Sequence, residues 1–290
     1  MFKTSKELLA YCQEKNCKIS AYVLEEEVKH SRLTKEEVRM QVKEMLDVMM
    51  DTSKRTLEKG SRLSHGLIDD FAKKTWDYAK EDRIHVTEAS LLKSMAMAFS
   101  TFECNSGMGK IVAAPTAGSS GILPAALATA KDKLNCGDDL LIDGILTAMG
   151  IGQFIGGYAT FAGSEGGCQA ECGSAASMAA GALVEIFGGS PEESLHGASI
   201  ALVNILGLVC DPIGGLVQYP CTFRNSSGVM NAMISSDLAL AGTTSVIPFE
   251  EVCQAMSEVG NALPASLRET GLGGLAGTKT GQKICKNIFG

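Results

Sequence analysis

The sequence predicts an all-α fold, a multi-helix domain with glycine-rich site loops and little or no strand. Capping-box patterns, which begin helices, occur at Thr34 with Glu37 and at Ser190 with Glu193. The second half of the chain is rich in glycine and alanine, which suits closely packed helices. Strand signals are few along the whole chain.

Charge divides the chain into two parts. Residues 1–100 hold more than half of the charged residues but only two of the 32 glycines. We therefore expect a charged helical front over residues 1–100 that packs on the rest. Residues 101–290 are expected to form one continuous domain that carries the site.

The front is expected to consist of amphipathic helices with solvated charged faces. The second of them begins with the capping box at Thr34 and places Val38, Val42 and Leu46 on one face. Apolar residues at helical spacing indicate a further helix before the first glycine-rich loop. The expected helices of the front cover residues 3–14, 34–60, 61–81 and 87–102.

In the second part, a brief extended segment over residues 110–116 is expected before a series of helices. Ser190 caps one of these helices, with Pro191 at its first position. Residues 144–164 carry no charge and are long enough to cross a membrane, but their glycines favour a buried helix. The expected helices of this part cover residues 122–130, 138–152, 173–187, 190–209, 231–241 and 248–260.

Composition excludes several classes of protein. A net charge of −7 argues against a nucleic-acid partner, which calls for basic patches. Ten cysteines in 290 residues are too sparse for a disulfide scaffold. No charged start followed by an apolar run marks a signal peptide. We therefore expect a cytoplasmic protein with reduced thiols and no membrane partner.

Three cysteines lie in loops rich in glycine and proline. Cys168 lies in the run GGCQAEC at residues 166–172, and Cys210 and Cys221 bound the run CDPIGGLVQYPC. The chain between Cys168 and Cys210 is long enough for two helices, so the three thiols could meet at the ends of packed helices. Converging thiolates select iron–sulfur clusters or zinc. Buried, inert thiols are the alternative, and the spacing alone leaves all three open.

The run that ends at Cys221, with Arg224 and Asn225 after it, resembles the signature of the iron–sulfur-dependent L-serine dehydratases. The resemblance is to the separate alpha subunit of the two-chain form. It is dense from about Cys104 to Thr280 and weak before that. Further matching segments lie at residues 105–110, 113–118, 188–192, 267–270 and 273–276.

The resemblance implies a [4Fe-4S] cluster bound by Cys168, Cys210 and Cys221, with one iron open to substrate. The open iron would act as a Lewis acid that polarises a hydroxyl group. The family can also close with a cysteine that occupies this iron, and Cys285 is the candidate for that fourth ligand. No lysine has a convincing sequence context for pyridoxal phosphate, so we expect no such cofactor.

Two Gly/Ser loops, one of them before a helix N-terminus, suit a small carboxylate. A plain pair of turns is the alternative interpretation. The resemblance places these loops in the active site, and an arginine after Cys221 could clamp a carboxylate. The candidate substrate contacts are Asn105, Ser106, Lys110, Thr116, Ser119, Arg224 and Asn225.

The sequence departs from the family pattern at several positions. The family's Ser-Ser-His-Thr motif, which bears its proposed base, is absent, so the catalytic base is expected on a beta-subunit partner. His65 follows a serine, but an ordinary loop histidine is the favoured interpretation. No histidine occurs near residues 203–205, and Ala170-Glu171-Cys172 replaces the usual Gly-Glu-Val. The alternatives to serine dehydration are a lyase acting on another small amino acid, such as a cysteine desulfidase, and a non-catalytic subunit.

Overall fold

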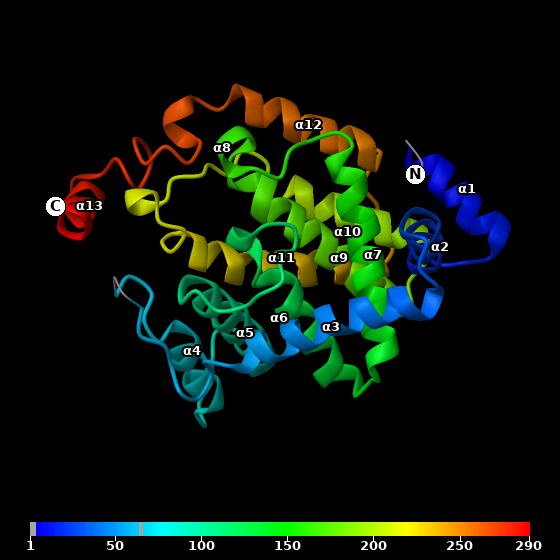
Figure 1. The fold of residues 1–290 in the computed structure, drawn as a ribbon, viewed down its shortest axis with the longest axis horizontal. Helices are drawn as coiled ribbons and strands as arrows, with labels where there is room; N and C mark the ends of the chain where they lie inside the picture. Colours follow the sequence, from blue (N-terminus) through cyan, green and yellow to red (C-terminus); the bar gives the residue numbers. More distant parts are fainter. Residues whose placement is uncertain (1–3, 64–65) are drawn as a thin grey trace.

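The computed structural model describes residues 4–63 and 66–290. Within these residues the fold contains thirteen α-helices and no strand, which confirms the all-α prediction (Figure 1). One isolated parallel bridge joins Cys210 to Arg268. The irregular segments therefore carry little sheet structure, and the site described below is built on helix ends and loops.

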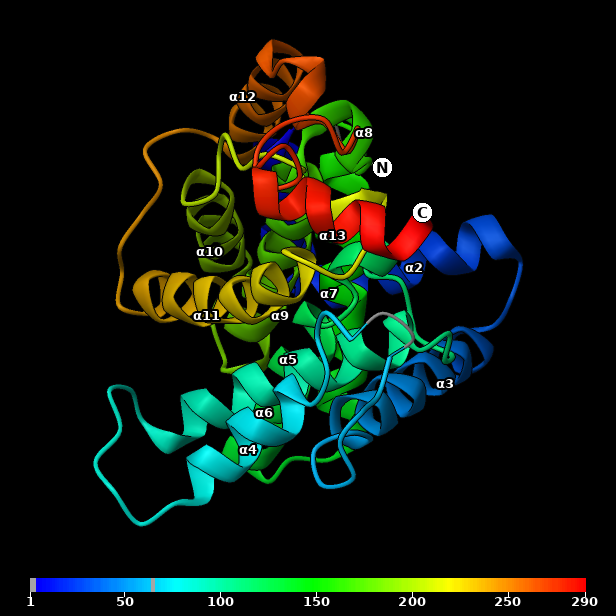
Figure 2. The ribbon, with the colours of Figure 1, turned by 90° about the vertical axis from the view of Figure 1, so that its left-hand side faces the viewer.

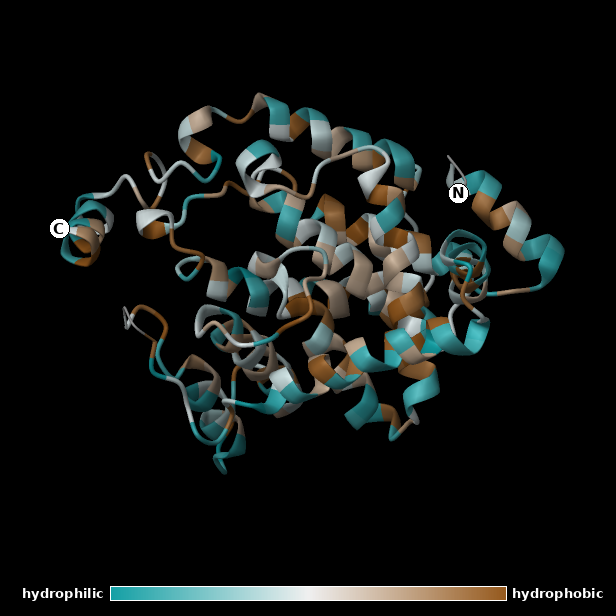
Figure 3. Cartoon of the chain, viewed as in Figure 1, coloured by the Kyte–Doolittle hydropathy of each residue, from teal (hydrophilic) through white to brown (hydrophobic). Residues whose placement is uncertain are grey.

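The front of the chain forms four complete helices and most of a fifth, α5 (Ala89–Ser106), and the capping box at Thr34 is present. The Thr34 hydroxyl accepts the Glu37 N–H at 3.2 Å, and Glu37 accepts the Thr34 N–H at 2.8 Å. Charged residues cover the outer faces of these helices, while less polar residues gather in the middle of the molecule (Figure 3). The four complete helices are α1 (Ser5–Lys15), α2 (Ile19–Ser31), α3 (Lys35–Lys54) and α4 (Phe71–Lys80).

The helix expected over residues 61–81 begins only at Phe71, so this prediction was wrong in its first half. The Asp70 carboxylate accepts the Ser61 N–H at 2.8 Å, and the Asp69 carboxylate accepts the Leu63 N–H at 2.7 Å. Aspartate side chains that bond nearby backbone in this way compete with helix formation. The predicted candidate His65 lies outside the described residues.

At the centre of the remaining helices lies α9, in which every residue is buried. The helices α6, α7, α10 and α11 all contact it (Figures 1 and 2). The core is continuous, with buried apolar residues from Leu8 to Met256 in one cluster. The helices of this part are α5 (Ala89–Ser106), α6 (Ile122–Leu134), α7 (Asp138–Gly156), α8 (Gly163–Gly166), α9 (Ser174–Ile186), α10 (Pro191–Val203), α11 (Cys221–Leu240), α12 (Phe249–Ala262) and α13 (Lys279–Phe289).

The helix α7 is long and apolar enough to cross a membrane by length and composition. Its apolar window is 61% buried inside the protein, where it packs on α2 and α9. Its apolar composition is therefore accounted for by packing in the core.

Two helix boundaries near the cysteines differ from prediction. The helix expected to run to residue 209 ends at Val203, and Gly207 adopts φ +86° in the turn that follows. Cys210 is therefore held in a loop rather than at a helix end. In contrast, α11 begins at Cys221, earlier than the expected residue 231, so that Arg224 and Asn225 lie in its first turns.

Candidate active site

The three predicted cysteine ligands come from separate segments and are all buried. Cys168 directly precedes a π-helical turn, η2 (Gln169–Gly173), which continues into α9. Cys210 lies in the loop after α10, and Cys221 is the first residue of α11. Their exposed fractions are at most 3%. A fourth buried cysteine, Cys172, lies on the same π turn.

Cys168 is the centre of the sulfur contacts. The Cys172 sulfur lies 3.4 Å from the Cys168 sulfur, and the Cys210 thiol also hydrogen-bonds to Cys168. These two hydrogen bonds lower the pKa of Cys168 well below its ordinary value. The same bonds raise the pKa values of Cys172 and Cys210. Burial raises the pKa of Cys221.

Arg224 supplies positive charge to this group of sulfurs. Its guanidinium forms an ion pair with Asp211, and Asp211 also accepts the Leu275 N–H at 2.7 Å. Burial opposes the arginine's charge, but the Cys168 thiolate and Asp211 outweigh it and raise the pKa of Arg224. Its Nη1 atom is buried and has no hydrogen-bond partner among the described residues. This nitrogen is therefore free to bind a further anionic group.

Thr116 and Ser119, two predicted substrate contacts, lie together beside the cysteines. Their hydroxyl oxygens are 3.1 Å apart, and the Thr116 hydroxyl donates to Glu171 Oε1 at 3.0 Å. Burial, followed by the charge of Cys168, raises the pKa of Glu171 to about 7. A partly buried carboxyl group is thus placed between the Gly/Ser turn and the sulfurs.

Asn225 braces the same turn from α11. Its Oδ1 accepts the Gly121 N–H at 2.8 Å, and its Nδ2 donates to Gly118 O at 2.8 Å and to Cys221 O at 2.9 Å. Because all three bonds are to backbone, this side chain fixes the turn relative to Cys221. In this arrangement Asn225 acts by positioning the loop.

The other predicted contacts lie farther along the two loops. Asn105 donates to Ala117 O at 3.2 Å, and Ser106 lies 3.5 Å from Val217 O, at the end of α5. Lys110 is exposed and makes no hydrogen bond or ion pair with any residue that the structure describes. The substrate-contact roles of these three residues stay predictions.

The C-terminal helix α13 packs on η3 (Ile213–Gly215), the turn between Cys210 and Cys221 (Figure 2). A Cβ atom added at Gly214 would lie 3.6 Å from the Cys285 sulfur. Cys285 is therefore held against the cysteine-bearing loop. In residues 4–63 and 66–290, no group of three or more His, Cys, Asp or Glu side chains closes on a single metal ion.

The sequence did not identify Glu171, Cys172 or Asp211 as parts of this site. All three lie inside the two quoted cysteine runs, so position next to Cys168 and Cys210 was the available signal. Gln169 was also missed. Its amide donates to Gly166 O and Met256 O at 2.9 Å and accepts the Gly207 N–H at 2.8 Å, which ties the Cys168 loop to α12 and to the segment before Cys210.

Comparison with known proteins gives a consistent assignment. The model of the serine dehydratase alpha chain family matches residues 14–276. The L-serine dehydratase alpha chain of Peptoniphilus asaccharolyticus is 58% identical over 100% of this chain and 99% of its own length. A probable L-serine dehydratase alpha chain of Bacillus subtilis is 43% identical over 100% of this chain and 96% of its own length. L-serine dehydratase 1 of Escherichia coli is 33% identical over 95% of this chain but 61% of its own length. These matches confirm the resemblance inferred from the cysteine runs, and the chain belongs to the serine dehydratase alpha chain family.

Proposed function

We propose that this chain is the catalytic alpha subunit of an L-serine dehydratase that uses a [4Fe-4S] cluster held by Cys168, Cys210 and Cys221. The reaction eliminates water from L-serine, and the resulting aminoacrylate hydrolyses to pyruvate and ammonia. The observation that supports the proposal is that Cys168, Cys210 and Cys221 are all buried and that the charge of Cys168 raises the pKa values of Cys210, Cys221 and Arg224.

The residues present fit such a cluster in their chemistry. Soft thiolate ligands select iron–sulfur clusters, and Cys168 is already stabilised in its charged form. A cluster bound by thiolates is anionic, and the unpartnered Nη1 of Arg224 offers a buried donor and a positive charge beside it. The site thus provides both ligands and charge compensation for the group.

When bound, a cluster with an open iron would supply Lewis-acid polarisation of the serine hydroxyl. The chain's own residues provide orientation. The Thr116 and Ser119 hydroxyls lie at the start of the turn before α6, where backbone N–H groups and a helix N-terminus favour a carboxylate. Asn225 holds that turn in place relative to Cys221, which would fix the position of a substrate bound at the turn.

We propose that a beta subunit completes the enzyme and supplies the base that removes the α-proton. The relatives named alpha chains imply a second chain, and the E. coli relative extends well beyond the region that matches this chain. Cys285, which lies against the loop between Cys210 and Cys221, is proposed as the fourth ligand in the substrate-free state. We also propose that the enzyme works in a reducing, cytoplasmic compartment.

The test is anaerobic reconstitution with iron and sulfide, alone and with the beta chain co-expressed. We expect a brown protein with about four irons per chain and pyruvate formation from L-serine in the two-chain enzyme. The same assay with L-cysteine and L-threonine measures substrate choice, and faster turnover of L-cysteine would assign the enzyme to desulfidation instead. A chain that takes up no iron would be a non-catalytic subunit, and the proposal would be rejected.

A further inference from the structure

We propose that Glu171 binds the ammonium group of the amino-acid substrate and so selects amino acids over the corresponding hydroxy acids. This inference rests on the proposed function, because it assigns a role within the same site. It also places a substrate-binding group on a residue that the sequence did not single out.

The first support is the position of the carboxylate beside the turn expected to hold the substrate carboxylate. Glu171 lies on the π turn η2, and its Oε1 accepts a hydrogen bond from the Thr116 hydroxyl at 3.0 Å. A Cβ atom added at Gly118, in the same turn, would lie 3.1 Å from this Oε1. The absence of a side chain at Gly118 therefore lets the turn approach the glutamate closely.

The second support is that Glu171 Oε2 lies near the Cys210 sulfur, beside Gly163. A Cβ atom added at Gly163 would lie 2.9 Å from Glu171 Oε2 and 3.0 Å from the Cys210 sulfur. The carboxylate oxygen and the sulfur thus flank one point in space. A small molecule held between the Thr116–Ser119 turn and Cys210 would have this oxygen at its side.

The third support is unused hydrogen-bonding capacity. Within the part of the chain that the structure describes, Glu171 Oε2 accepts no hydrogen bond, and the side chain is only partly buried. Asp211, another carboxylate of the site, is already engaged by Arg224 and Leu275. Glu171 therefore has a free carboxylate oxygen that can accept hydrogen bonds from a bound group.

Charge decides which group binds there. A small amino acid carries one cation, its ammonium group, and one anion, its carboxylate. Arg224 and the Gly/Ser turn favour the anion, whereas Glu171 can favour only the cation. A bound ammonium group would pair with the ionised carboxylate of Glu171 through charge-assisted hydrogen bonds.

The test compares ligands that differ only in the ammonium group. The reconstituted two-chain enzyme is titrated by anaerobic calorimetry with L-alanine and with propanoate, neither of which has a hydroxyl group to lose. We expect E171Q to weaken L-alanine binding about tenfold or more and to leave propanoate binding unchanged. KM for L-serine should rise by a similar factor at normal iron content.

Two further variants serve as controls. E165Q removes a nearby exposed negative charge and should leave both affinities unchanged. E171D keeps the charge on a shorter side chain and should retain part of the preference for L-alanine; it also serves if E171Q fails to fold.

The outcomes separate this inference from the proposed function. If E171Q binds L-alanine as tightly as the wild type, loses both ligands equally, or loses iron, Glu171 does not recognise the ammonium and the inference falls alone. If the reconstituted wild-type enzyme does not convert L-serine, the proposed function fails and takes the inference with it.

Discussion

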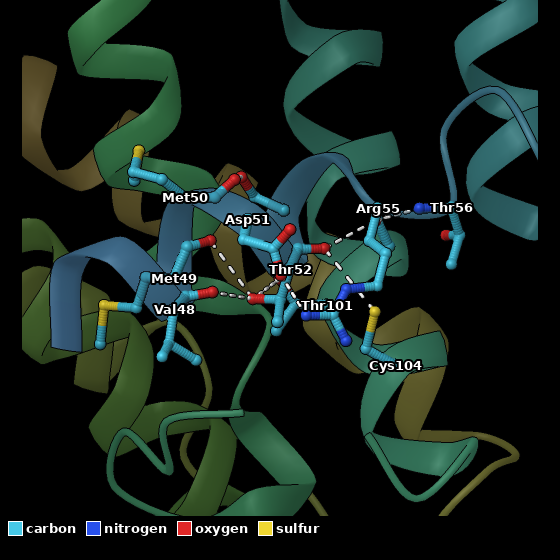
Figure 4. Close-up of polar contacts among 11 residues, drawn as sticks. Val48, Met49, Met50, Asp51, Thr52, Arg55, Thr56, Thr101 and Cys104 are labelled. Carbon is cyan, nitrogen blue, oxygen red and sulfur yellow. Dashed lines mark hydrogen bonds and ion pairs between the residues drawn. The ribbon is translucent and has the colours of Figure 1, made fainter. Parts of the chain in front are cut away.

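Two buried regions of this chain each place a cysteine near a glutamate, and they differ in how completely their polar atoms are bonded. At the junction of α3 and α5, Glu103 accepts the Thr56 hydroxyl at 2.6 Å and the Ala72 N–H at 3.0 Å. Next to it, the Cys104 thiol faces Thr52 O at 4.0 Å (Figure 4). In the candidate active site, Glu171 has one such donor, and Cys168 has two thiols around it.

Burial acts in the same direction on most of these groups. It raises the pKa values of Glu103, Cys104 and Glu171. The regions differ at Cys168, whose pKa is lowered, and at Arg224, whose Nη1 is left without a partner among the described residues. A raised pKa therefore does not distinguish a structural polar cluster from a site. A hydrogen-bond donor without a partner, beside a cysteine whose pKa is lowered, does distinguish the two.

The largest effect is expected from removing one thiol of the site. C210S should abolish iron binding and bring pyruvate formation to background, because a serine hydroxyl is a poor ligand for the soft iron of a cluster. The measurements are iron content and absorbance after anaerobic reconstitution, together with turnover of L-serine.

C104S is the matched control from the other region. Its thiol is buried and has a raised pKa, so the same exchange should leave iron content and turnover per folded molecule unchanged. A colourless C210S protein that still forms pyruvate, or a C104S protein that loses iron, would remove the distinction between the regions.

The next effect is on stability at the α3–α5 junction. E103A removes an acceptor that two buried donors share, and their lost hydrogen bonds should lower the free energy of unfolding by about 2–4 kcal/mol. Urea denaturation measures this change, and the turnover of the folded fraction should be unaltered. A loss below about 0.5 kcal/mol would show that water replaces the glutamate without penalty.

Local sequence rules predicted much of the fold. The capping boxes at Thr34 and Ser190 are present because each needs only residues three apart. The three cysteines were predicted as ligands because their runs resemble a known family, and this role stays a prediction. The ion pair between Asp211 and Arg224 was not predictable, because no local pattern in the sequence between them indicates that their side chains meet.

The failed half of the helix over residues 61–81 has a physical reason. Leu67 and Ile68 have the apolar character of a helix face, but they serve a small separate cluster with Phe102 and Cys221. A loop can place apolar side chains in such a cluster when aspartate side chains accept hydrogen bonds from the N–H groups of its backbone. The spacing of apolar residues indicates which side chains are buried. It does not by itself show whether those residues lie in a helix or in a loop.

The early start of α11 was missed for a related reason. Gly228 is a weak helix former, and its neighbours Ser226 and Ser227 favour caps and turns. In the structure a Cβ at Gly228 would lie 2.4 Å from Ile122 Cδ1, so glycine permits close packing of α11 on α6. Tertiary packing outweighs the local preference, and this contact is invisible in the sequence.

A third buried glutamate, Glu185, extends the comparison. One of its carboxylate oxygens has no hydrogen-bond partner among the described residues, and no cysteine hydrogen-bonds to it. Glu185 Oε2 accepts the Thr147 hydroxyl at 2.6 Å, and Oε1 is buried without a partner among described residues. Burial raises its pKa above the ordinary 4.5. The folded state therefore holds a proton that the unfolded state has lost, and this group's stabilisation declines as pH rises above 4.5 through the raised pKa.

E185Q should remove this decline, because its amide does not titrate. The difference in unfolding free energy, E185Q minus wild type, should become more positive with pH by up to about 1.4 kcal/mol per unit in that window. Urea denaturation at several pH values measures the slope. Parallel curves for the two proteins would show that Glu185 ionises normally when folded.

The smallest effect is expected outside both regions, at the exposed start of α3. T34A removes the hydroxyl that accepts the Glu37 N–H and should lower the unfolding free energy by about 1 kcal/mol. S190A makes the same change at α10, where Glu193 completes the box, and should have a similar effect. Neither variant should alter iron content or KM, because both caps are exposed and neither hydrogen-bonds to Cys168, Cys210 or Cys221 in the described part of the chain. A change in iron content with T34A would mean that the stability of the front controls the cysteine site, and the contrast between a structural region and a separate site would no longer hold.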